Sequence, residues 1–361
     1  MVLMTFGELT LIPVVSKYIA DLAPADMRGR YLSFYWFAWG IARGADRRFP
    51  ERQHCTPLHL DRRIGHWPDQ GGRAFHADQP CAGKTTRKGN IMLKIRLLEH
   101  SELPLLKDFA PLEWNTNLSV TFSFHFGYLY YYPIVAELEG IIVGCAQGLL
   151  NGDAGWLGNI IVLPEVRGQG IGQALTQHLV EFFRAKGCTS QILVATQLGE
   201  PVYRKLGFIE VSRYVFLKRA NPLAPEPISR VRQAEEKDFP HILALDWQAT
   251  GEERTPFLGR FFETAWVYEK DPSEGVEGFY LPDLRDGPVI ARTEQAGRAL
   301  LKFKLDQGKT SVVVPEANIP ALDFLKGAGF EETTSAPRMA LGKDSDWKPT
   351  WVFSRGAGYC G

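Results

Sequence analysis

The segment from Val162 to Gln173, VLPEVRGQGIGQ, has a composition and spacing suited to binding a phosphate group. Gly168, Gly170 and Gly172 alternate with larger residues, and glycine has no Cβ to keep an anion away from the backbone N–H groups. A helix that starts at such a loop adds the positive end of its dipole. Arg167 adds a planar cationic donor. The sequence therefore predicts a site for a phosphate-bearing cofactor.

A strand and a helix are predicted on either side of this loop. Residues 157–163 form an apolar run, and after the loop apolar residues recur at helical spacing until Lys186-Gly187 ends the helix. The flanking sequence predicts a strand at 95–98, a helix start at Ser101, a hairpin of 132–139 and 141–148 turning at Gly140, a strand at 191–195, and a short helix at 201–206 closed by Gly207-Phe208. This order predicts an α/β (α+β) domain over residues 93–220.

Size and composition limit the function classes. With 361 residues the chain can hold two or three domains, and its formal net charge of zero gives no reason to expect a nucleic-acid partner. The five cysteines are scattered and odd in number, which predicts no disulfide framework and favours a cytoplasmic location. No apolar run reaches the ~18 residues of a membrane helix, and no signal peptide is evident.

The N-terminal segments differ from the rest in character. Residues 1–44, with an Arg28-Gly29-Arg30 turn between two apolar stretches, resemble one membrane hairpin of a major facilitator superfamily transporter. Because transport requires many more spans, we do not expect that activity or a membrane partner. Residues 45–92 are rich in polar residues and predicted to be disordered. Their His and Cys residues match no paired ligand spacing, so no metal site is expected.

The C-terminal part repeats elements of the first domain. A proline-rich linker at 221–227 precedes residues 228–343, in which the helix-start sequence Gly297-Arg298-Ala299-Leu300, a strand at 311–314 and a turn ending in Gly329-Phe330 recur in the same order. This copy lacks the glycine loop, and Leu325 occupies the position of Tyr203. We expect it to be a degenerate, non-catalytic copy that binds or shapes the acceptor site, followed by a tail at 344–361.

Residues 93–220 resemble the GNAT superfamily of acyl-CoA-dependent N-acetyltransferases. The resemblance depends on the Arg-x-x-Gly-x-Gly element at Arg167–Gly172 together with the Tyr-x-x-x-Gly-Phe ending at Tyr203–Phe208. It implies a mixed, mostly antiparallel sheet flanked by helices, in tandem with a second GNAT-like domain. It also implies acetyl-CoA as cosubstrate and direct acetyl transfer to a small-molecule or peptide amine. The oligomeric state is left open.

The resemblance also implies roles for residues. The Arg167–Gly172 amides would hold the pyrophosphate of CoA, and Val162 and Leu163 would pair with pantetheine. The full set of cofactor-binding residues implied is Ile161, Val162, Leu163, Arg167, Gly168, Gln169, Gly170, Ile171, Gly172 and Gln173. A dinucleotide-binding fold is less favoured, because it requires a different glycine spacing and an acidic residue about twenty positions on, whereas Glu181 comes too early.

Tyr203 is the predicted general acid, since a phenol near the departing thiolate can protonate it. The alternative is that its ring only packs beneath the cofactor. The general base is not assigned. Many relatives place a Glu on the strand before the loop, but this strand offers Asn159, which can position a water and cannot take the proton. Glu137 and Glu139, predicted to share one strand face, and His125 are the other candidates.

Two further questions stay open at this stage. The aromatic residues between Trp114 and Tyr131 either form core or line an acceptor pocket. In the second copy, Asp246, Arg254 and Arg338 either bind a ligand or form surface ion pairs. The rival to an enzyme is a non-catalytic acyl-CoA-binding or sensor protein, which the missing strand Glu favours.

Overall fold

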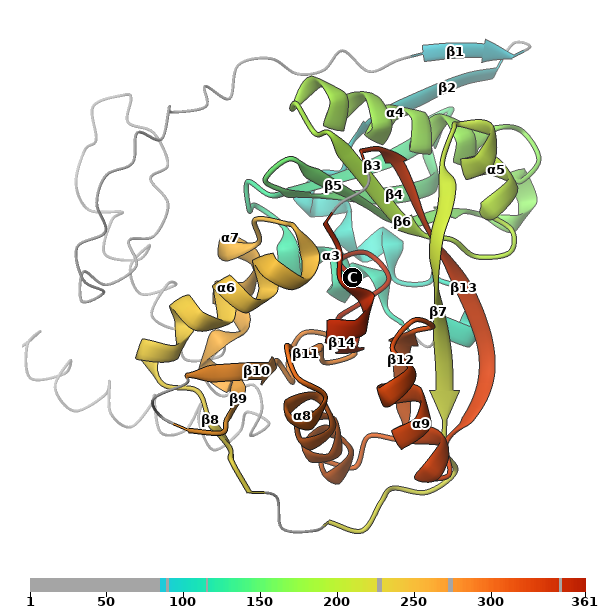
Figure 1. Cartoon of the computed structure of the whole chain (residues 1–361). Helices are drawn as coiled ribbons and strands as arrows, with labels where there is room; N and C mark the ends of the chain where they lie inside the picture. Colours follow the sequence, from blue (N-terminus) through green and yellow to red (C-terminus); the bar gives the residue numbers. More distant parts are fainter. Residues whose placement is uncertain (1–84, 89–90, 115, 226–228, 272–274, 344–345) are drawn as a thin grey trace, which may run out of the picture. The chain divides into compact units, whose positions relative to one another are not determined.

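The computed structural model of the chain describes residues 85–88, 91–114, 116–225, 229–271, 275–343 and 346–361 (Figure 1). All of them belong to one compact unit, Asp78–Gly361. The transporter-like segment predicted at 1–44 and nearly all of the disordered segment predicted at 45–92 lie outside these residues. Within the described part of the chain, no helix has the length and apolar character needed to cross a membrane.

The first half of this unit is built around a mostly antiparallel sheet that helix α4 covers on one face (Figure 1). The predicted strands at 95–98 and 191–195, the hairpin and the two helices are all confirmed. The elements in chain order are β1 (Thr85–Lys88), β2 (Ile91–Leu97), the 3-10 helices η1 (His100–Leu106) and η2 (Leu112–Trp114), α3 (Leu118–His125), β3 (Tyr131–Leu138), β4 (Ile141–Asn151), β5 (Ala154–Val162), η3 (Pro164–Val166), α4 (Ile171–Ala185), β6 (Ser190–Val194), α5 (Glu200–Lys205) and β7 (Ile209–Lys218).

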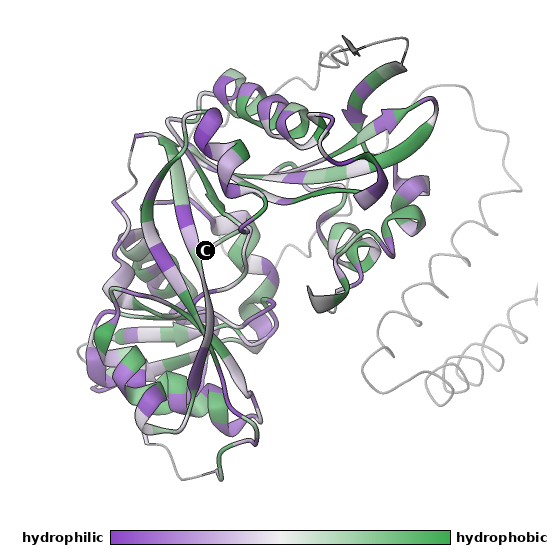
Figure 2. Cartoon of the chain, turned by 90° about the vertical axis from the view of Figure 1, so that its right-hand side faces the viewer, coloured by the Kyte–Doolittle hydropathy of each residue, from purple (hydrophilic) through white to green (hydrophobic). Residues whose placement is uncertain are grey.

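The second half contains the remaining elements and a five-stranded sheet in the order β14-β11-β10-β9-β8. Figure 2 shows hydrophobic and hydrophilic residues on the same helices, as expected for helices that cover sheets. The elements are β8 (Val231–Gln233), η4 (Glu236–Asp238), α6 (Phe239–Thr250), α7 (Thr255–Leu258), η5 (Gly259–Thr264), β9 (Trp266–Glu269), β10 (Val276–Tyr280), β11 (Val289–Ala291), α8 (Glu294–Asp306), β12 (Ser311–Pro315), α9 (Ile319–Gly327), β13 (Glu331–Gly342), η6 (Pro349–Trp351) and β14 (Val352–Ser354).

The internal duplication is visible in the order of elements. The series β5-α4-β6-α5-β7 of the first half recurs as β11-α8-β12-α9-β13 in the second. The turn after the short helix is the same in both, because Phe208 N–H donates to Tyr203 O at 3.1 Å and Phe330 N–H donates to Leu325 O at 3.0 Å. Leu325 is therefore the structural counterpart of Tyr203, as the sequence predicted.

Strands of the two halves alternate where the halves meet. The nine-stranded sheet runs β1-β2-β3-β4-β5-β6-β13-β7-β12, so β13 of the second half lies between β6 and β7 of the first. Arg338 of β13 pairs with Val194 of β6 and with Ser212 of β7. In Figure 1, β7 and β13 run side by side along one edge of both halves. The linker predicted at 221–227 separates two repeats in the sequence, but it is not a boundary in the sheet.

The glycine loop follows a place where two strands separate. Strands β5 and β6 are parallel neighbours only at Ala154–Trp156 and Ser190–Ile192. Beyond Trp156, β5 continues to Val162 while its edge on the β6 side has no strand partner among the described residues. A gap of this kind exposes backbone N–H and C=O groups that can pair with an extended ligand.

In the second half the corresponding gap is filled by the chain's own C-terminal segment. Strands β11 and β12 do not pair with each other, and β14 pairs with β11. On the other side, Arg355 N–H donates to Val313 O of β12 at 2.9 Å. Phe353 of β14 lies against Gly297 in the first turn of α8, where an added Cβ would come within 2.2 Å of the ring. The segment then continues to the first half, where Tyr359 and Cys360 are buried.

Candidate active site

The glycine loop has the backbone conformation that an anion site requires. Gly168 and Gly170 have φ of 77° and 85°, a region that glycine enters without steric cost. No heavy atom lies within 4 Å of a Cβ built at either position. Helix α4 starts at Ile171, and no side chain caps its N-terminus. The loop therefore leaves unblocked amides at a helix N-terminus, which fits a pyrophosphate.

In the strand before the loop, the backbone N–H and C=O of Val162 face the gap, whereas the N–H of Leu163 faces β4. Leu163 N–H donates to Val143 O of β4 at 2.9 Å, and Val162 is the partner of Gly144. In an antiparallel ladder this pattern turns Val162's own N–H and C=O to the opposite edge. Arg167 Nε donates to Val162 O at 3.0 Å, so the Arg167 side chain ties the loop to the strand. The Leu163 N–H is thus engaged with β4 rather than facing pantetheine.

The other predicted cofactor residues divide by exposure. Ile161 and Ile171 are buried at 5% and 3%, so only their backbone groups can reach a cofactor. Gln169 and Gln173 are exposed at the loop and in the first turn of α4. Gly172 is near Val162, whose Cγ2 would lie 3.7 Å from an added Cβ. All of these positions belong to a single strand-loop-helix connection.

Tyr203 lies on α5 and its ring is buried in the core beneath α4. The residue Gly199 is required beside it, because a Cβ there would come within 2.7 Å of the ring. Burial raises the pKa of Tyr203 to about 12, so the phenol stays protonated at neutral pH. No hydrogen bond of its hydroxyl is found within the described part of the chain. The hydroxyl is therefore a protonated donor that no described acceptor engages.

Asn159 lies at a β-bulge in β5. Its φ is 48°, and the register with β4 shifts between the pairs Cys145–Ile161 and Gln147–Gly158. The side-chain Nδ2 of Asn159 is buried without a hydrogen-bond acceptor among the described residues. The same holds for Nε2 of Gln147, whose Oε1 accepts a hydrogen bond from Tyr131 Oη at 2.9 Å. The bulge thus gathers amide donors that can bind an oxygen atom.

The candidate bases lie away from the gap. Glu137 on β3 pairs with Arg96, whose Nε lies 2.7 Å from Oε2, and Arg96 also pairs with Glu102. These carboxylates raise the pKa of Arg96 above its usual range. Glu139 is exposed in the turn between β3 and β4 with φ of 50°. The expectation that Glu137 and Glu139 share one strand face is therefore wrong, because the turn begins before Glu139.

His125 is buried at 1% exposure at the end of α3. Burial, together with the charges of Arg260 and Arg285, lowers its pKa to about 3, so the ring is neutral and weakly basic. Its Nε2 lies 3.3 Å from Tyr359 Oη and its Nδ1 lies 3.4 Å from Tyr130 Oη. The aromatic residues around it divide as follows: Phe122, Tyr130 and Tyr131 are buried in the core, and Trp114 and Tyr128 are exposed.

The charged residues singled out in the second half form a buried network. Asp246 on α6 and Arg254 form an ion pair at 1% and 2% side-chain exposure, so the expectation of surface ion pairs is wrong for them.

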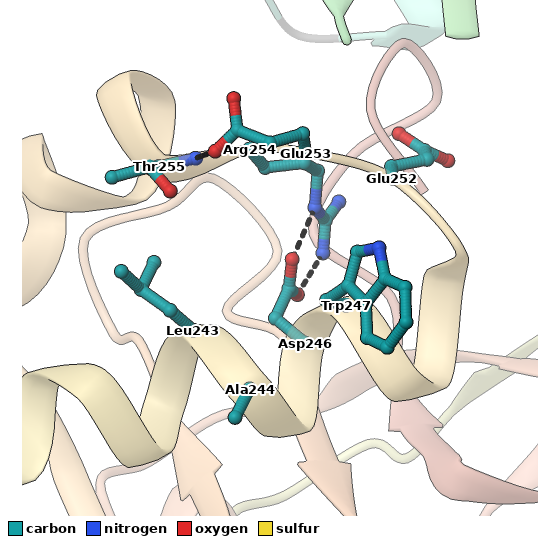
Figure 3. Close-up of a pocket in the computed structure, with 8 residues that line it drawn as sticks. All are labelled: Leu243, Ala244, Asp246, Trp247, Glu252, Glu253, Arg254 and Thr255. Atoms are coloured by element: carbon teal, nitrogen blue, oxygen red, sulfur yellow. Dashed lines mark hydrogen bonds and ion pairs between the residues drawn. The ribbon is translucent and has the colours of Figure 1, made fainter. Parts of the chain in front are cut away.

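Asp246 and Arg254 line a cavity of about 270 Å³ between α6 and the following loop, with Leu243, Trp247 and Glu252 (Figure 3). Glu252 accepts a hydrogen bond from Trp156 Nε1 of β5 at 2.9 Å. Burial raises the pKa of this carboxyl. Arg338 stacks over Trp347 at 4.2 Å.

Gly158 and Tyr359 lie next to the bulge of the candidate site, and the sequence did not identify either of them. A Cβ at Gly158 would lie 2.2 Å from Tyr359 Cβ, so the C-terminal segment touches the backbone of β5 next to the bulge. A glycine inside a strand is a signal of such a close approach. The identity of the approaching segment, about 200 residues later, has no local signal.

Among the described residues, Cys145 and Cys188 are not placed to act as nucleophiles, and no cluster of metal-binding side chains is found. Cys145 is fully buried and burial raises the pKa of its thiol, and Cys188 lies beyond the C-terminal end of α4. No group of three or more His, Cys, Asp or Glu side chains in that part of the chain is arranged to hold a metal ion.

Two family matches agree with the duplication. Residues 129–210 and residues 242–350 each match an acetyltransferase (GNAT) domain. The chain is therefore a GNAT acetyltransferase with a second GNAT domain. The matches give no support to the resemblance of residues 1–44 to a transporter.

Similar proteins come from several sources. Glucosamine 6-phosphate N-acetyltransferase of Trypanosoma brucei brucei is 43% identical over 54 residues, which are 15% of this chain and 37% of that protein. The chain thus spans a little over a third of this curated relative. A candidate acetyltransferase from Pyrococcus horikoshii has a similar structure, with a TM-score of 0.64 at 21% identity, covering 74% of this chain and 96% of that one. A GCN5-related N-acetyltransferase from Sphaerobacter thermophilus has a TM-score of 0.51 at 15% identity, covering 71% and 98%. These structures share the fold.

Proposed function

We propose that the first GNAT domain transfers an acetyl group from acetyl-CoA directly to an amine, and that the second domain has no transfer site of its own. The observation that carries this proposal is the glycine loop at the end of the β5–β6 gap, with a buried, protonated Tyr203 on one side. A binding protein needs the loop and the gap. The buried phenol, which has no hydrogen-bond partner among the described residues, is an additional feature that suits proton donation in an enzyme.

In this proposal the amides of Gly168–Gly172 bind the pyrophosphate, and the Val162 N–H, which faces away from β4, pairs with the pantetheine arm. The thioester then lies beside the bulge at Asn159, where Gln147 and Asn159 offer amide donors to its carbonyl oxygen. The amine attacks the carbonyl carbon and forms the new C–N bond. The C–S bond breaks, and Tyr203 protonates the departing thiolate. The proton that the new amide nitrogen loses passes through solvent and restores the phenol.

We assign none of the described carboxylates as the base that takes the proton of the amine. Glu137 is held by Arg96, Glu139 is exposed at a turn, and His125 is a weak base. The acceptor would therefore react as its free amine, and the transfer rate should rise with pH toward the pKa of the acceptor, ~10 for an alkylamine. The chemistry of the T. brucei relative suggests an amino sugar phosphate as one acceptor to test.

Tyr203→Phe tests the proposal. We expect kcat to fall by about 100-fold or more, since general acid catalysis contributes roughly 10² to 10⁴, while acetyl-CoA affinity measured by calorimetry stays at the wild-type value. Thiol release with a panel of amines measures the rate. A wild-type protein that binds acetyl-CoA and releases no thiol with any amine would support the non-catalytic alternative instead.

A further inference from the structure

Arg260 of η5 has part of its guanidinium bound to the first half. Its Nη1 donates to Phe124 O at 2.6 Å and to Tyr130 Oη at 3.2 Å. Its Cζ lies 4.0 Å from the ring centre of Phe124 and 4.2 Å from that of Tyr128. Contact with aromatic faces stabilises a guanidinium. Together these contacts fix the orientation of the group before any ligand binds.

The Nε–Nη2 edge of this guanidinium has no hydrogen-bond partner in the part of the chain that the structure describes. Neither atom belongs to the buried polar atoms that lack a partner, and Arg260 is partly exposed. The edge is therefore accessible to solvent. Two parallel N–H groups are the geometry with which arginine binds a carboxylate or a phosphate bidentately. The edge is thus oriented and open for an oxyanion.

Two arginines near His125 have no carboxylate partner among the described residues. Besides burial, the charges of Arg260 and Arg285 lower the pKa of His125, so both arginines lie near this ring. Arg285 is exposed, and the carboxylate next to it in the sequence, Asp286, pairs with Arg355 at 3.1 Å instead. Positive charge without a counter-ion attracts anions. The surroundings of the open edge therefore favour a negatively charged ligand.

Arg260 and helix α4, which the glycine loop begins, lie on opposite faces of the nine-stranded sheet. A Cβ at Gly148 would meet Phe183 of α4 at 2.8 Å, so the preceding residue, Gln147, points to the other face. Tyr131 Oη donates to Gln147 on that face, and the Tyr131 ring contacts α3. Arg260 is bound at the C-terminal end of α3. An anion at Arg260 is therefore separate from the predicted pyrophosphate site.

We propose that Arg260 is an oxyanion-binding residue, whose Nε–Nη2 edge takes the carboxylate or phosphate group of a small molecule. This inference goes beyond the proposed function and does not depend on it. The oxyanion has two possible sources, an amine acceptor that carries it and a separate anionic ligand. An amino sugar phosphate is an acceptor of the first kind.

Titration of the full-length protein with inorganic phosphate tests the site directly. Nuclear magnetic resonance of the arginine Nε–H groups in isotope-labelled protein measures binding residue by residue. We expect the Arg260 resonance to shift with a Kd at least about 10-fold lower than that of Arg184, because an oriented group loses less entropy on binding. Arg184 is the matched control, since it is exposed in the last turn of α4. Acetate gives the same comparison for a carboxylate.

Tyr128→Leu tests the contribution of the aromatic contact. The Tyr128 side chain is 44% exposed, so we expect the core to tolerate the change. Loss of one ring should raise the phosphate Kd at Arg260 by about two- to fivefold, the scale of an exposed cation–π contact, and leave the Kd at Arg184 unchanged. Circular dichroism verifies that the variant is folded.

Acetyl-transfer kinetics distinguish the two sources of the oxyanion. Glucosamine 6-phosphate and glucosamine are a matched pair of acceptors with and without the group. Arg260→Lys keeps the charge and loses the bidentate edge. If the acceptor carries the oxyanion, this variant should lower the kcat/KM of glucosamine 6-phosphate relative to glucosamine by about 10-fold, the scale of one hydrogen bond to a charged group. A wild-type ratio assigns the site to a separate anionic ligand.

The outcomes separate this inference from the proposed function. Thiol release that is absent with every amine overturns the proposed function and leaves the phosphate titration to decide the inference. An Arg260 resonance that shifts with neither phosphate nor acetate, or that shifts with the same affinity as Arg184, overturns the inference.

Discussion

At the residue scale, some side chains of the candidate site make other contacts than the sequence suggested. Arg167 is the cationic residue of the loop. Its Nε donates a hydrogen bond to Val162 O and so stabilises the connection between strand and loop. Ile171 lies in the core and offers only its backbone. We therefore expect the anion site to consist mainly of backbone amides, and the positive φ at Gly168 and Gly170 favours glycine there.

Gly170→Val should weaken acetyl-CoA binding by about 10- to 100-fold, because one hydrogen bond to a charged group contributes roughly 1.5–3 kcal/mol and a branched side chain would occupy the space of the pyrophosphate. Calorimetry measures the affinity. Gly187→Val is a matched control, since Gly187 has φ of 83° and equally open surroundings at the other end of α4. Gly187→Val should lower the free energy of unfolding by a similar amount and keep the wild-type affinity for acetyl-CoA. Equal affinities in both variants would contradict the loop assignment.

The pKa of His125 predicts acid sensitivity. The folded protein keeps this ring neutral down to a pKa of about 3, whereas the unfolded chain protonates it near 6.5. Between these values the unfolded state binds more protons, so stability falls as pH decreases from about 6.5, by up to ~1.4 kcal/mol per unit. Urea unfolding of His125→Gln from pH 6.5 to 4.5 should show a slope reduced by about one proton. His241→Gln, at an exposed position on α6, should keep the wild-type slope. An unchanged slope in His125→Gln would argue against the buried neutral ring.

At the element scale, the sequence predicts the repeated elements well and their connections poorly. The strand-loop-helix at 157–186 and the hairpin at 132–148 are local patterns, set by apolar periodicity and by glycine positions, and the structure has both. The placement of β13 between β6 and β7 is a pairing of distant segments, and neither strand carries a local sign of its partner. The contact of Tyr359 with Gly158 is of the same kind, so the packing of the C-terminal segment on β5 could not be predicted from the sequence.

The filled gap in the second domain predicts one acetyl-CoA per chain. Strand β14 lies between β11 and β12, and Phe353 occupies the space over Gly297 at the start of α8. Calorimetric titration should give one site in the wild type, and Gly170→Val should show no site of wild-type affinity. Phe353→Ala should lower stability by about 3–5 kcal/mol, as expected for loss of a buried ring, without adding a second site. Two equivalent sites in the wild type would show that β14 is displaced by the ligand.

At the scale of the whole described unit, the two GNAT domains are interdependent. They share the nine-stranded sheet through β13, and the C-terminal segment of the second covers the face of β5 opposite α4. Glu252 of the second half also accepts a hydrogen bond from Trp156 of the first. The second domain is thus a structural part of its neighbour's sheet.

This interdependence predicts the outcome of cutting the chain after Ala220. From the sequence, a second half that shapes the acceptor site predicts a soluble fragment with altered acceptor kinetics. A second half that covers an apolar face predicts a fragment that aggregates. In the structure the fragment 78–220 loses β13, which leaves β6 with an open edge, and it exposes the apolar residues that Tyr359 and Cys360 cover. Open edges and apolar patches promote aggregation. We therefore expect this fragment to be insoluble when expressed alone, and to become soluble and bind acetyl-CoA when co-expressed with residues 221–361.

The control is residues 78–361, one compact unit, which should fold and bind acetyl-CoA as the full chain does. Size-exclusion chromatography and calorimetry give the readout. A monomeric fragment 78–220 with full acetyl-CoA affinity would mean that β7 can pair directly with β6, and that the strand exchange is dispensable.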